Sequence, residues 1–319
     1  MKYITHILSI VISIILLSSC NSSQKHTAEQ KNLIIFHAGS LSVPFKAIAD
    51  SFKKENPNIT IILEAAGSVE CARKITELNR ECDILASADY LVIDKLLIPN
   101  FANWNLQFSG NEMVIAYTSK SKFVNKIDSI SWPDILLNDD VYYGRSDPNS
   151  DPCGYRTLIT LKLAEKYYKT TTDFYNKIAT KDNRFIRPKE VDLLALLQSG
   201  AIDYLFIYKS VALQHDLKFI SLNSAINLGD SKFKDFYSNV NVEIRGAKPN
   251  TSITVFGEPM IYSFTILKNA PNKEVAIQFA QFILDEKKGL VILRNLGMPI
   301  IQPSYSEVSF NIPDTALNF

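Results

Sequence analysis

The chain has 319 residues, of which 46% are hydrophobic and 21% charged, and its formal net charge is +1. This composition excludes a disordered chain, and the small charge gives no overall field that would favour nucleic acid or an acidic surface. The chain contains four cysteines, and their positions match neither C-x-x-C nor a zinc-type spacing.

The N-terminus carries a targeting pattern. Lys2 precedes an apolar run over Ile4–Leu17, and Leu-Ser-Ser-Cys occupies residues 17–20. The run is short for a membrane-spanning helix, and only small polar residues follow it. The pattern resembles the lipobox of a bacterial lipoprotein signal, which implies cleavage before Cys20 and lipid attachment there. The mature chain would then be extracytoplasmic, in the periplasm or at the cell surface, and lipid-anchored to the membrane; an uncleaved anchor helix is the alternative.

Residues 20–31 are polar, which predicts a flexible tether after the lipidated cysteine. Beyond the tether, short apolar runs alternate with helical periodicity. Strands are predicted over Leu33–His37, Thr60–Glu64, Asp83–Ala86, Met113–Thr118, Val141–Arg145, Ala201–Tyr208 and Met260–Leu267. Helices are predicted over Val43–Lys54, Val69–Leu78, Leu91–Leu97, Ser131–Leu137, Gly154–Lys169, Val191–Gln198, Ser210–His215 and Lys273–Asn295.

This alternation predicts an α/β fold of two lobes, each a mainly parallel sheet with helices on both faces. Hinge strands would join the lobes near Thr118 and Gly257, and ligands would bind in the cleft at the carboxyl ends of the strands. The predicted parts are a signal peptide over 1–19, a tether over 20–31, a first lobe over 32–118, a second lobe over 119–256, and a return to the first lobe with a C-terminal tail over 257–319.

Two Ala-Gly-Ser sequences stand where a predicted strand turns into a helix. The first contains Ser40 and the second Ser68. Glycine allows close backbone approach, serine offers a hydroxyl donor, and the free N–H groups of a helix start attract anions. Two such turns on adjacent strands predict an anion site made of neutral donors. The alternative is that both serines only cap their own helices.

The second lobe offers a third helix start after a strand. Asp151 followed by Pro152 is typical of an N-cap and a first helical residue. Asp151 could serve only as this cap, or as an ion partner of Arg145 or Arg156. Cys153 could also be combined with His215 and an Asp into a nucleophilic triad, which would make the protein a secreted cysteine hydrolase, although no local context pairs them.

Several motifs together resemble the tungstate/molybdate-binding proteins of ABC importers, in the branch first known from archaea. The resemblance covers roughly residues 33–300. The motifs are FHAGSLSVPF (36–45), EAAGSVECARK (64–74), ASADY (86–90), NEMVIAYTSKS (111–121), GRSDPNSDPCGYR (144–156), RPKEVDLLALLQSGAIDY (187–204) and YKSVALQH (208–215).

The resemblance implies a two-lobed periplasmic-binding-protein fold, of type II, that closes on a tetrahedral oxyanion. The donors it implies come from both lobes, and we add Tyr208 from the last motif. The predicted oxyanion-binding residues are Ser40, Leu41, Ser68, Asp151, Pro152, Cys153 and Tyr208. In this branch a carboxylate can approach the metal centre itself, a role that falls on Asp151 here. An Asp beside a dianion is acceptable if it bonds the electron-poor metal, bears a proton or turns away.

One position departs from the family. Members usually carry a second metal-approaching Glu in the strand before the Tyr-Lys/Arg-Ser-Val-Ala segment, and here Ile207 occupies that position. We therefore expect a tetrahedral site, or one with at most a single carboxylate, Asp151.

The sequence thus predicts a monomeric receptor that captures tungstate or molybdate and passes it to an ABC permease in the membrane. It would be no enzyme, need no cofactor and bind no nucleic acid. The alternatives are a receptor for sulfate or phosphate, the cysteine hydrolase, and an adhesion or scaffold lipoprotein.

Overall fold

The computed structural model of the chain describes residues 31–169, 173–246 and 250–312. The predicted signal peptide over 1–19, Cys20 and the tether up to residue 30 lie outside the described residues. Lys31 already belongs to the first strand, which therefore begins inside the predicted tether. Within the described ranges, no helix has the length and apolar character needed to cross a membrane.

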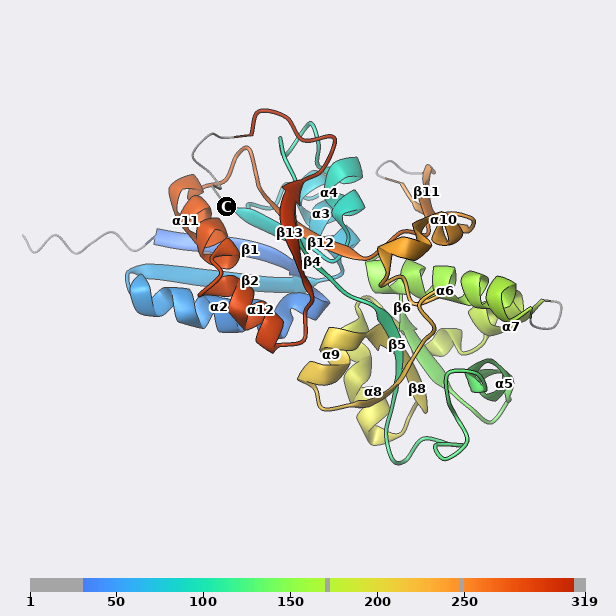
Figure 1. The fold of residues 1–319 in the computed structure, drawn as a ribbon. Helices are drawn as coiled ribbons and strands as arrows, with labels where there is room; N and C mark the ends of the chain where they lie inside the picture. The colour runs from blue at the N-terminus through green and yellow to red at the C-terminus, as the bar shows by residue number, and fades with distance from the viewer. Residues whose placement is uncertain (1–30, 170–172, 247–249, 313–319) are drawn as a thin grey trace, which may run out of the picture. The chain divides into compact units, whose positions relative to one another are not determined.

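The first sheet has six strands in the order β13-β4-β12-β3-β1-β2 (Figure 1). These strands are β1 (Lys31–Ala38), β2 (Ile59–Ala66), β3 (Ile84–Ser87), β4 (Leu106–Gly110), β12 (Ile261–Ile266) and β13 (Ile300–Tyr305). The helices of this sheet are η1 (Gly39–Leu41, 3₁₀), α2 (Ser42–Glu55), α3 (Ser68–Thr76), α4 (Tyr90–Leu96), α11 (Lys273–Leu284) and α12 (Gly289–Asn295). Helices α2, α11 and α12 pack together on one face, and α3 and α4 on the other (Figure 1).

Aromatic side chains join the two ends of the chain in this first lobe. Phe52 of α2 contacts Phe279 and Phe282 of α11 edge-on, with ring centroids 5.2 and 5.4 Å apart. The helical spacing of these apolar positions buries one face of each helix against the sheet. The C-terminal helices therefore complete the core that the N-terminal strands begin, as the sequence predicts.

The second sheet has five strands in the order β7-β6-β8-β5-β9. Its strands are β5 (Met113–Tyr117), β6 (Tyr143–Ser146), β7 (Ile186–Arg187), β8 (Tyr204–Tyr208) and β9 (Lys218–Ser221). Its helices are α5 (Trp132–Leu137), α6 (Pro152–Tyr168), α7 (Phe174–Thr180), η2 (Asn183–Phe185), η3 (Glu190–Leu193), α8 (Leu194–Ser199) and α9 (Lys209–Gln214). The buried Trp132 ring contacts the rings of Phe174 and Phe206 edge-on. Gly200 ends α8 as its C-cap with a φ of 82°, a left-handed conformation that glycine adopts readily.

A hairpin follows the second sheet along the chain. It consists of β10 (Asn241–Arg245) and β11 (Ser252–Phe256), preceded by η4 (Ser231–Phe233) and α10 (Lys234–Tyr237). None of these four elements is predicted from the sequence.

Both sheets are mixed rather than mainly parallel. Strand β1 pairs parallel with β2 and β3 as predicted, whereas β12 is antiparallel to β3 and β4. In the second sheet β6 is parallel to β7 and β8, and β5 is antiparallel to β8 and β9.

The chain leaves the first sheet earlier than predicted. Strand β4 of the first sheet ends at Gly110 and β5 of the second begins at Met113, so the crossing lies there and not near Thr118. The Asn111 side chain at this crossing donates to Ser210 Oγ, at 2.7 Å, and to the Tyr262 hydroxyl, at 3.2 Å. The return lies between the end of β11 at Phe256 and the start of β12, which agrees with the predicted crossing near Gly257.

The last predicted helix, Lys273–Asn295, is two helices in the structure. Helix α11 ends at Leu284 and α12 begins at Gly289. The intervening segment is charged, and Gly289 packs so tightly that an added Cβ would lie 2.3 Å from the Ile283 carbonyl oxygen. The apolar periodicity continues through the break, which is why it predicts one helix.

Candidate functional site

The two Ala-Gly-Ser turns lie side by side at the carboxyl ends of adjacent parallel strands. Ala38, the last residue of β1, pairs with Ala66, the last residue of β2. Ser40 and Ser68 follow directly and are both buried, at 2% and 0% exposure. The parallel register therefore brings the two predicted donors to one place.

Neither serine caps its own helix. The N-cap residues of α2 and α3 are Leu41 and Gly67, and neither makes a side-chain cap hydrogen bond. Instead, Ser40 Oγ accepts a hydrogen bond from the Tyr262 hydroxyl at 2.9 Å, and Ser68 Oγ accepts one from the Ala88 amide at 3.0 Å. The capping alternative is therefore wrong. Because each oxygen accepts, each hydroxyl proton can be donated elsewhere.

Asp151 is the N-cap of α6, as predicted. Its Oδ1 accepts from the Cys153 amide at 3.1 Å, and Pro152 is the first helical residue. Its Oδ2 accepts from the backbone amide of Glu190, also at 3.1 Å. Asp151 is only 1% exposed, and this burial raises the pKa of its carboxyl. The third helix start thus holds a buried carboxyl whose two oxygens are both fixed by backbone donors.

This third helix start packs directly against the second. The Ser150 carbonyl accepts from the Glu70 amide at 3.1 Å, which joins the turn before α6 to the first turn of α3. An added Cβ on Gly67 would lie 2.2 Å from the Ser150 oxygen and 3.0 Å from Asp151 Cβ. The second Ala-Gly-Ser turn therefore needs glycine for this close approach between the lobes, because Gly67 itself has an ordinary φ of −61°.

A second carboxyl, that of Glu190, lies beside Asp151. Glu190 is the first residue of η3 and is 1% exposed. Its Oε2 lies 3.1 Å from where a Cβ of Gly39 would stand, so the carboxyl faces the first Ala-Gly-Ser turn. Burial, and then the charge of Asp151, raise the pKa of Glu190 well above its ordinary value. Glu190 belongs to the motif over residues 187–204, but it is not among the oxyanion-binding residues predicted from the sequence.

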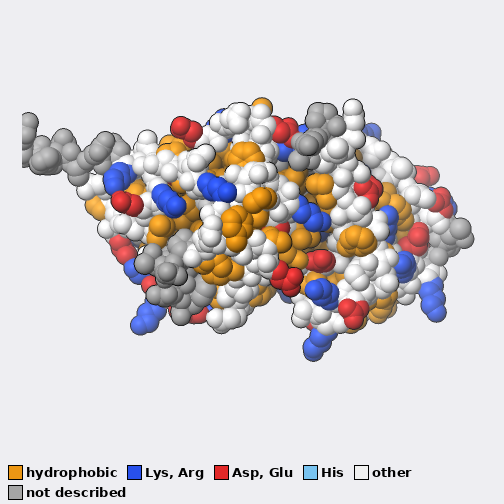
Figure 2. Space-filling view, turned by 90° about the horizontal axis from the view of Figure 1, so that it is seen from above, with side chains coloured by type: hydrophobic (Ala, Val, Ile, Leu, Met, Phe, Trp, Pro, Cys, Tyr) orange, Lys and Arg blue, Asp and Glu red, His pale blue; other side chains and the backbone are white. Residues whose placement is uncertain are grey.

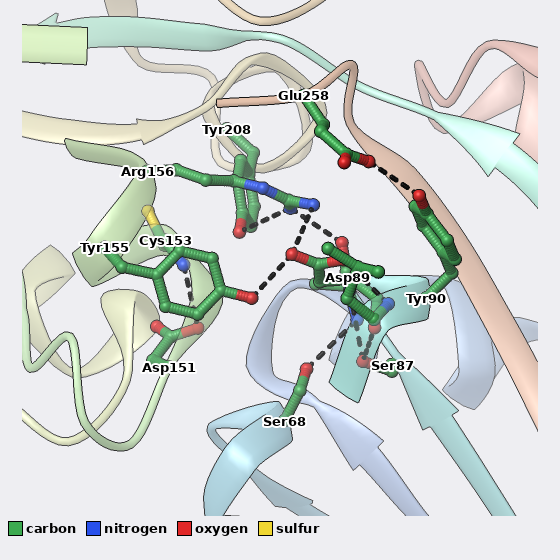
Figure 3. A network of polar contacts seen from close by, with 12 residues as sticks. Ser68, Ser87, Asp89, Tyr90, Asp151, Cys153, Tyr155, Arg156, Tyr208 and Glu258 are labelled. Atoms are coloured by element: carbon green, nitrogen blue, oxygen red, sulfur yellow. Dashed lines mark hydrogen bonds and ion pairs between the residues drawn. The ribbon is translucent and has the colours of Figure 1, made fainter. Parts of the chain in front are cut away.

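A buried ion pair connects the two lobes next to these turns (Figure 3). Tyr155 and Arg156 of α6 both reach Asp89, the N-cap of α4: the tyrosine hydroxyl donates to Oδ2 at 2.6 Å, and the guanidinium lies 3.3 Å from the same oxygen. Arg156 also donates to the Ala88 carbonyl at 2.7 Å and to the Tyr208 hydroxyl at 3.1 Å. Sequence reasoning misses these contacts because they join segments that are distant along the chain.

Tyr208 and Tyr262 link Arg156 to Ser40 through ring packing and hydrogen bonds. Their rings lie 6.0 Å apart, and both side chains are fully buried. Tyr208 accepts from Arg156, and Tyr262 donates to Ser40. The structure therefore brings together Ser40, Ser68, Asp151 and Tyr208, with Leu41, Pro152 and Cys153 adjacent in sequence. Ile207 is buried in β8, opposite Val114 of β5.

Cys153 is not placed as a nucleophile. Its thiol is fully buried with Sγ 3.7 Å from the Phe206 carbonyl, and burial raises its pKa well above the ordinary value. A thiolate is the reactive species, so this thiol is inert. Cys71, Cys82 and Cys153 are all free and buried.

The surface charge does not mark an anion site. On the face that Figure 2 shows, Lys and Arg side chains are scattered among Asp and Glu rather than gathered over one element. A cavity of about 230 Å³, lined in part by Arg80 and Cys82, lies near the start of β3, at the opposite end of that strand from Asp89. Because the net charge of the chain is only +1, any anion selectivity must come from local donors.

Comparison with known proteins identifies the family. Residues 33–297 match the family model described as bacterial extracellular solute-binding protein. The chain belongs to this family. It is 49% identical to an uncharacterized solute-binding protein of Petrotoga mobilis, with 85% of this chain and 84% of that protein covered. It is 41% identical to the molybdate/tungstate-binding protein WtpA of Pyrococcus abyssi, with 97% and 95% covered.

The fold comparison agrees. The periplasmic molybdate-binding protein of Azotobacter vinelandii superposes with a TM-score of 0.60 at 16% identity, covering 85% of this chain and all of that one. At this identity the likeness shows the fold alone. The predicted family resemblance and the two-lobed binding-protein fold are confirmed. Members of the family are solute-binding proteins and not enzymes, and their descriptions indicate no cofactor, in agreement with both predictions.

Proposed function

We propose that this solute-binding protein captures tungstate or molybdate between its two lobes and delivers the oxyanion to an ABC permease. The observation that carries the proposal is the convergence of three strand-to-helix turns, with Ser40, Ser68 and Asp151, on one buried place. The relatives named for molybdate and tungstate binding support this choice of ligand.

The donor set suits a dehydrated oxyanion. Two serine hydroxyls whose protons are available stand at the starts of helices, where backbone N–H groups and the helix dipole favour negative charge. Arg156 is paired with Asp89 and so adds little net positive charge. Binding therefore depends on many well-aimed neutral hydrogen bonds rather than on a free cation.

The carboxyls argue for a metal oxyanion over sulfate or phosphate. Two carboxylates beside a dianion would repel it unless they bond an electron-poor centre or carry a proton. Tungsten and molybdenum offer such a centre, whereas sulfur and phosphorus in their oxyanions do not. Phosphate remains the competing ligand, because a protonated phosphate could donate to Asp151.

Calorimetry with each oxyanion tests the proposal. We expect tight binding of tungstate and molybdate and much weaker binding of sulfate and phosphate at matched ionic strength. Binding of phosphate or sulfate without binding of tungstate would overturn it. The adhesion or scaffold alternative predicts no shift of melting temperature with any oxyanion, whereas a ligand that binds only the folded state raises it.

The Asp151→Asn substitution distinguishes two roles of the Asp151 side chain, capping of helix α6 and contact with the metal of the oxyanion. Asparagine is also a good N-cap, so helix α6 should persist. If the carboxylate approaches the metal, tungstate affinity falls and discrimination against sulfate decreases. An unchanged tungstate affinity would remove Asp151 from contact with the ligand.

The proposal includes anchoring through lipidated Cys20, which would keep the monomeric receptor outside the cytoplasm near its permease. The lipobox-like sequence over residues 17–20 supports this. Mass spectrometry of the N-terminal peptide from cells should show a diacylglyceryl cysteine, and Cys20→Ala should abolish it. An N-terminus that retains residues 1–19 would contradict cleavage.

A further inference from the structure

We propose that Asn111 is a positioning residue for oxyanion binding, which acts through the Tyr262 hydroxyl to hold the Ser40 hydroxyl as a hydrogen-bond donor to the ligand. This inference rests on the proposed function and extends it to two side chains outside the predicted set. It concerns what fixes the direction of the Ser40 proton, rather than which groups contact the oxyanion.

The first observation is that the backbone fixes the orientation of the Asn111 side chain. Its Oδ1 accepts from the Glu112 amide at 3.0 Å and from the Ser210 amide at 3.3 Å. A backbone N–H can only donate, so the side-chain amide of Asn111 cannot turn over without losing both hydrogen bonds. The position of Nδ2 is thereby fixed as well, and this nitrogen can only donate.

The second observation is a chain of hydrogen bonds that runs in one direction from this nitrogen. Asn111 Nδ2 donates to the Tyr262 hydroxyl at 3.2 Å, and that hydroxyl donates to Ser40 Oγ at 2.9 Å. Burial raises the pKa of Tyr262, so its hydroxyl stays protonated and able to donate. Because Ser40 Oγ accepts the Tyr262 proton, its own proton must point away from Tyr262.

The third observation is that this chain is shielded from water and ends in a proton that has no acceptor. Asn111, Tyr262 and Ser40 are all buried. Among the described residues, no group accepts the Ser40 hydroxyl proton. Buried donors are almost always hydrogen-bonded, and hydrogen bonds in a chain polarise one another. The direction set at Asn111 therefore reaches Ser40 and leaves its proton available to an oxyanion.

The second serine of the site shows why Ser40 depends on side chains. Ser68 Oγ accepts directly from the Ala88 backbone amide at 3.0 Å, which turns the Ser68 proton away from that amide. Within the described part of the chain, no backbone amide donates to Ser40 Oγ. The group that fixes its direction is the side chain of Asn111, with Tyr262 between them. We therefore expect Asn111 and Tyr262 to affect binding through Ser40.

A double-mutant cycle of Tyr262→Phe with Ser40→Ala tests the inference. Phenylalanine keeps the ring but removes the hydroxyl that holds Ser40. In the wild-type background we expect calorimetry to show a loss of about three- to tenfold in tungstate affinity, and in the Ser40→Ala background no further loss. If Tyr262 contacts the ligand directly or acts only by packing, the loss is the same in both backgrounds, and the proposal is overturned.

Tyr143→Phe is the matched control. Tyr143 is also a buried tyrosine, and its hydroxyl donates to the Ile178 carbonyl at 2.5 Å in the second lobe. We expect this variant to bind tungstate like the wild type. An equal loss in Tyr143→Phe and Tyr262→Phe would point to a general effect of removing a buried hydroxyl and would overturn the specific role of Tyr262.

A second cycle, of Asn111→Asp with Ser40→Ala, tests the start of the chain. Aspartate can keep both hydrogen bonds with the backbone, but a carboxylate oxygen in place of Nδ2 accepts from Tyr262 and turns its proton away from Ser40. The repulsion between this carboxylate and the dianion is the same in both backgrounds and cancels in the cycle. We expect the loss of tungstate affinity to be at least about fivefold larger in the wild-type background. Equal losses would overturn the role of Asn111.

The two cycles separate this inference from the proposed function. If Asn111→Asp does not fold, the Tyr262→Phe cycle decides alone. A Ser40→Ala variant that binds tungstate like the wild type would overturn this inference and leave the proposed function intact. Failure of the wild type to bind tungstate would instead overturn the proposed function.

Discussion

Arg156 and Asp89 form a buried ion pair between the two lobes, with the guanidinium 3.3 Å from Oδ2 and both side chains about 95% covered (Figure 3). Asp89 belongs to the first lobe and Arg156 to the second, so this pair exists only while the lobes are in contact. When the lobes open, Arg156 and Asp89 lose their electrostatic attraction, but both side chains become hydrated again. The pair therefore acts on the balance between the open and closed forms.

Asp89→Asn should weaken oxyanion binding by about 10- to 100-fold, because Arg156 is left buried without its counter-charge in the closed form. Asparagine Oδ1 can still accept from the Leu91 amide and cap α4, although its Nδ2 cannot accept from Tyr155, so the first lobe should fold normally. Calorimetry gives the affinity, and small-angle scattering at saturating tungstate gives the closed fraction. Glu55→Gln, which removes the exposed pair with Lys288, is the control. Wild-type affinity in Asp89→Asn would show that the pair has no part in closure.

Gly67→Ala should obstruct the same closure by a steric route. The new Cβ would lie 2.2 Å from the Ser150 carbonyl oxygen in the other lobe, although the φ of −61° suits alanine. Overpacking of this kind costs about 1–3 kcal/mol, so tungstate affinity should fall about tenfold or more. The ligand-free melting temperature should change little if the lobes open. Gly110→Ala, whose Cβ would stand 3.5 Å from the Met260 oxygen, is the matched control. Equal affinities for the two variants would contradict the prediction.

The sequence predicts much of this site because each turn is a local signal. Ala-Gly-Ser after an apolar run marks Ser40 and Ser68, and Asp-Pro before a helical pattern marks Asp151. Their convergence follows from the parallel pairing of β1 with β2, which the β-α-β order predicts.

Other parts of the site depend on contacts between distant segments. Asp89 and Arg156 meet across 67 positions of the chain, and no local pattern marks either of them. Glu190 is recognised only when its carboxyl is found buried without a donor. The sequence predicts the crossing near Thr118 and not at Asn111 for a related reason: the apolar run of β5 is the same whichever sheet it joins.

Ser40→Ala and Ser68→Ala should each weaken oxyanion binding, because each removes one hydroxyl donor. A hydrogen bond to a charged group contributes about 1.5–3 kcal/mol, so a loss of roughly 10- to 150-fold is expected. A serine hydroxyl bonds only the oxo groups of the anion and not its metal. The affinities for tungstate and for molybdate should therefore fall by the same factor. Ser238→Ala, which removes an exposed hydroxyl bonded to the Asp235 carbonyl, should bind normally. Unchanged affinity in both site variants would contradict the donor role of the serines.

His37 should make the folded state sensitive to mild acid. It is 2% exposed on β1, with Nδ1 2.8 Å from the Ala38 carbonyl and its ring 5.7 Å from that of Phe45. Burial lowers its pKa from 6.5 to about 4. Below pH 6.5 His37 takes up a proton in the unfolded chain but stays neutral in the folded one. The free energy of unfolding therefore decreases as the pH falls from 6.5 towards 4.

The full difference between these two pKa values corresponds to about 3 kcal/mol in the free energy of unfolding. Denaturant unfolding of the wild type and of His37→Gln at pH 7 and pH 4.5 isolates this contribution, because shifts from other groups cancel in the comparison. Between these two pH values the wild type should lose about 2–3 kcal/mol more than the variant, whatever the absolute stability of the variant. Parallel losses would mean that His37 takes up its proton in the folded chain near its ordinary pKa.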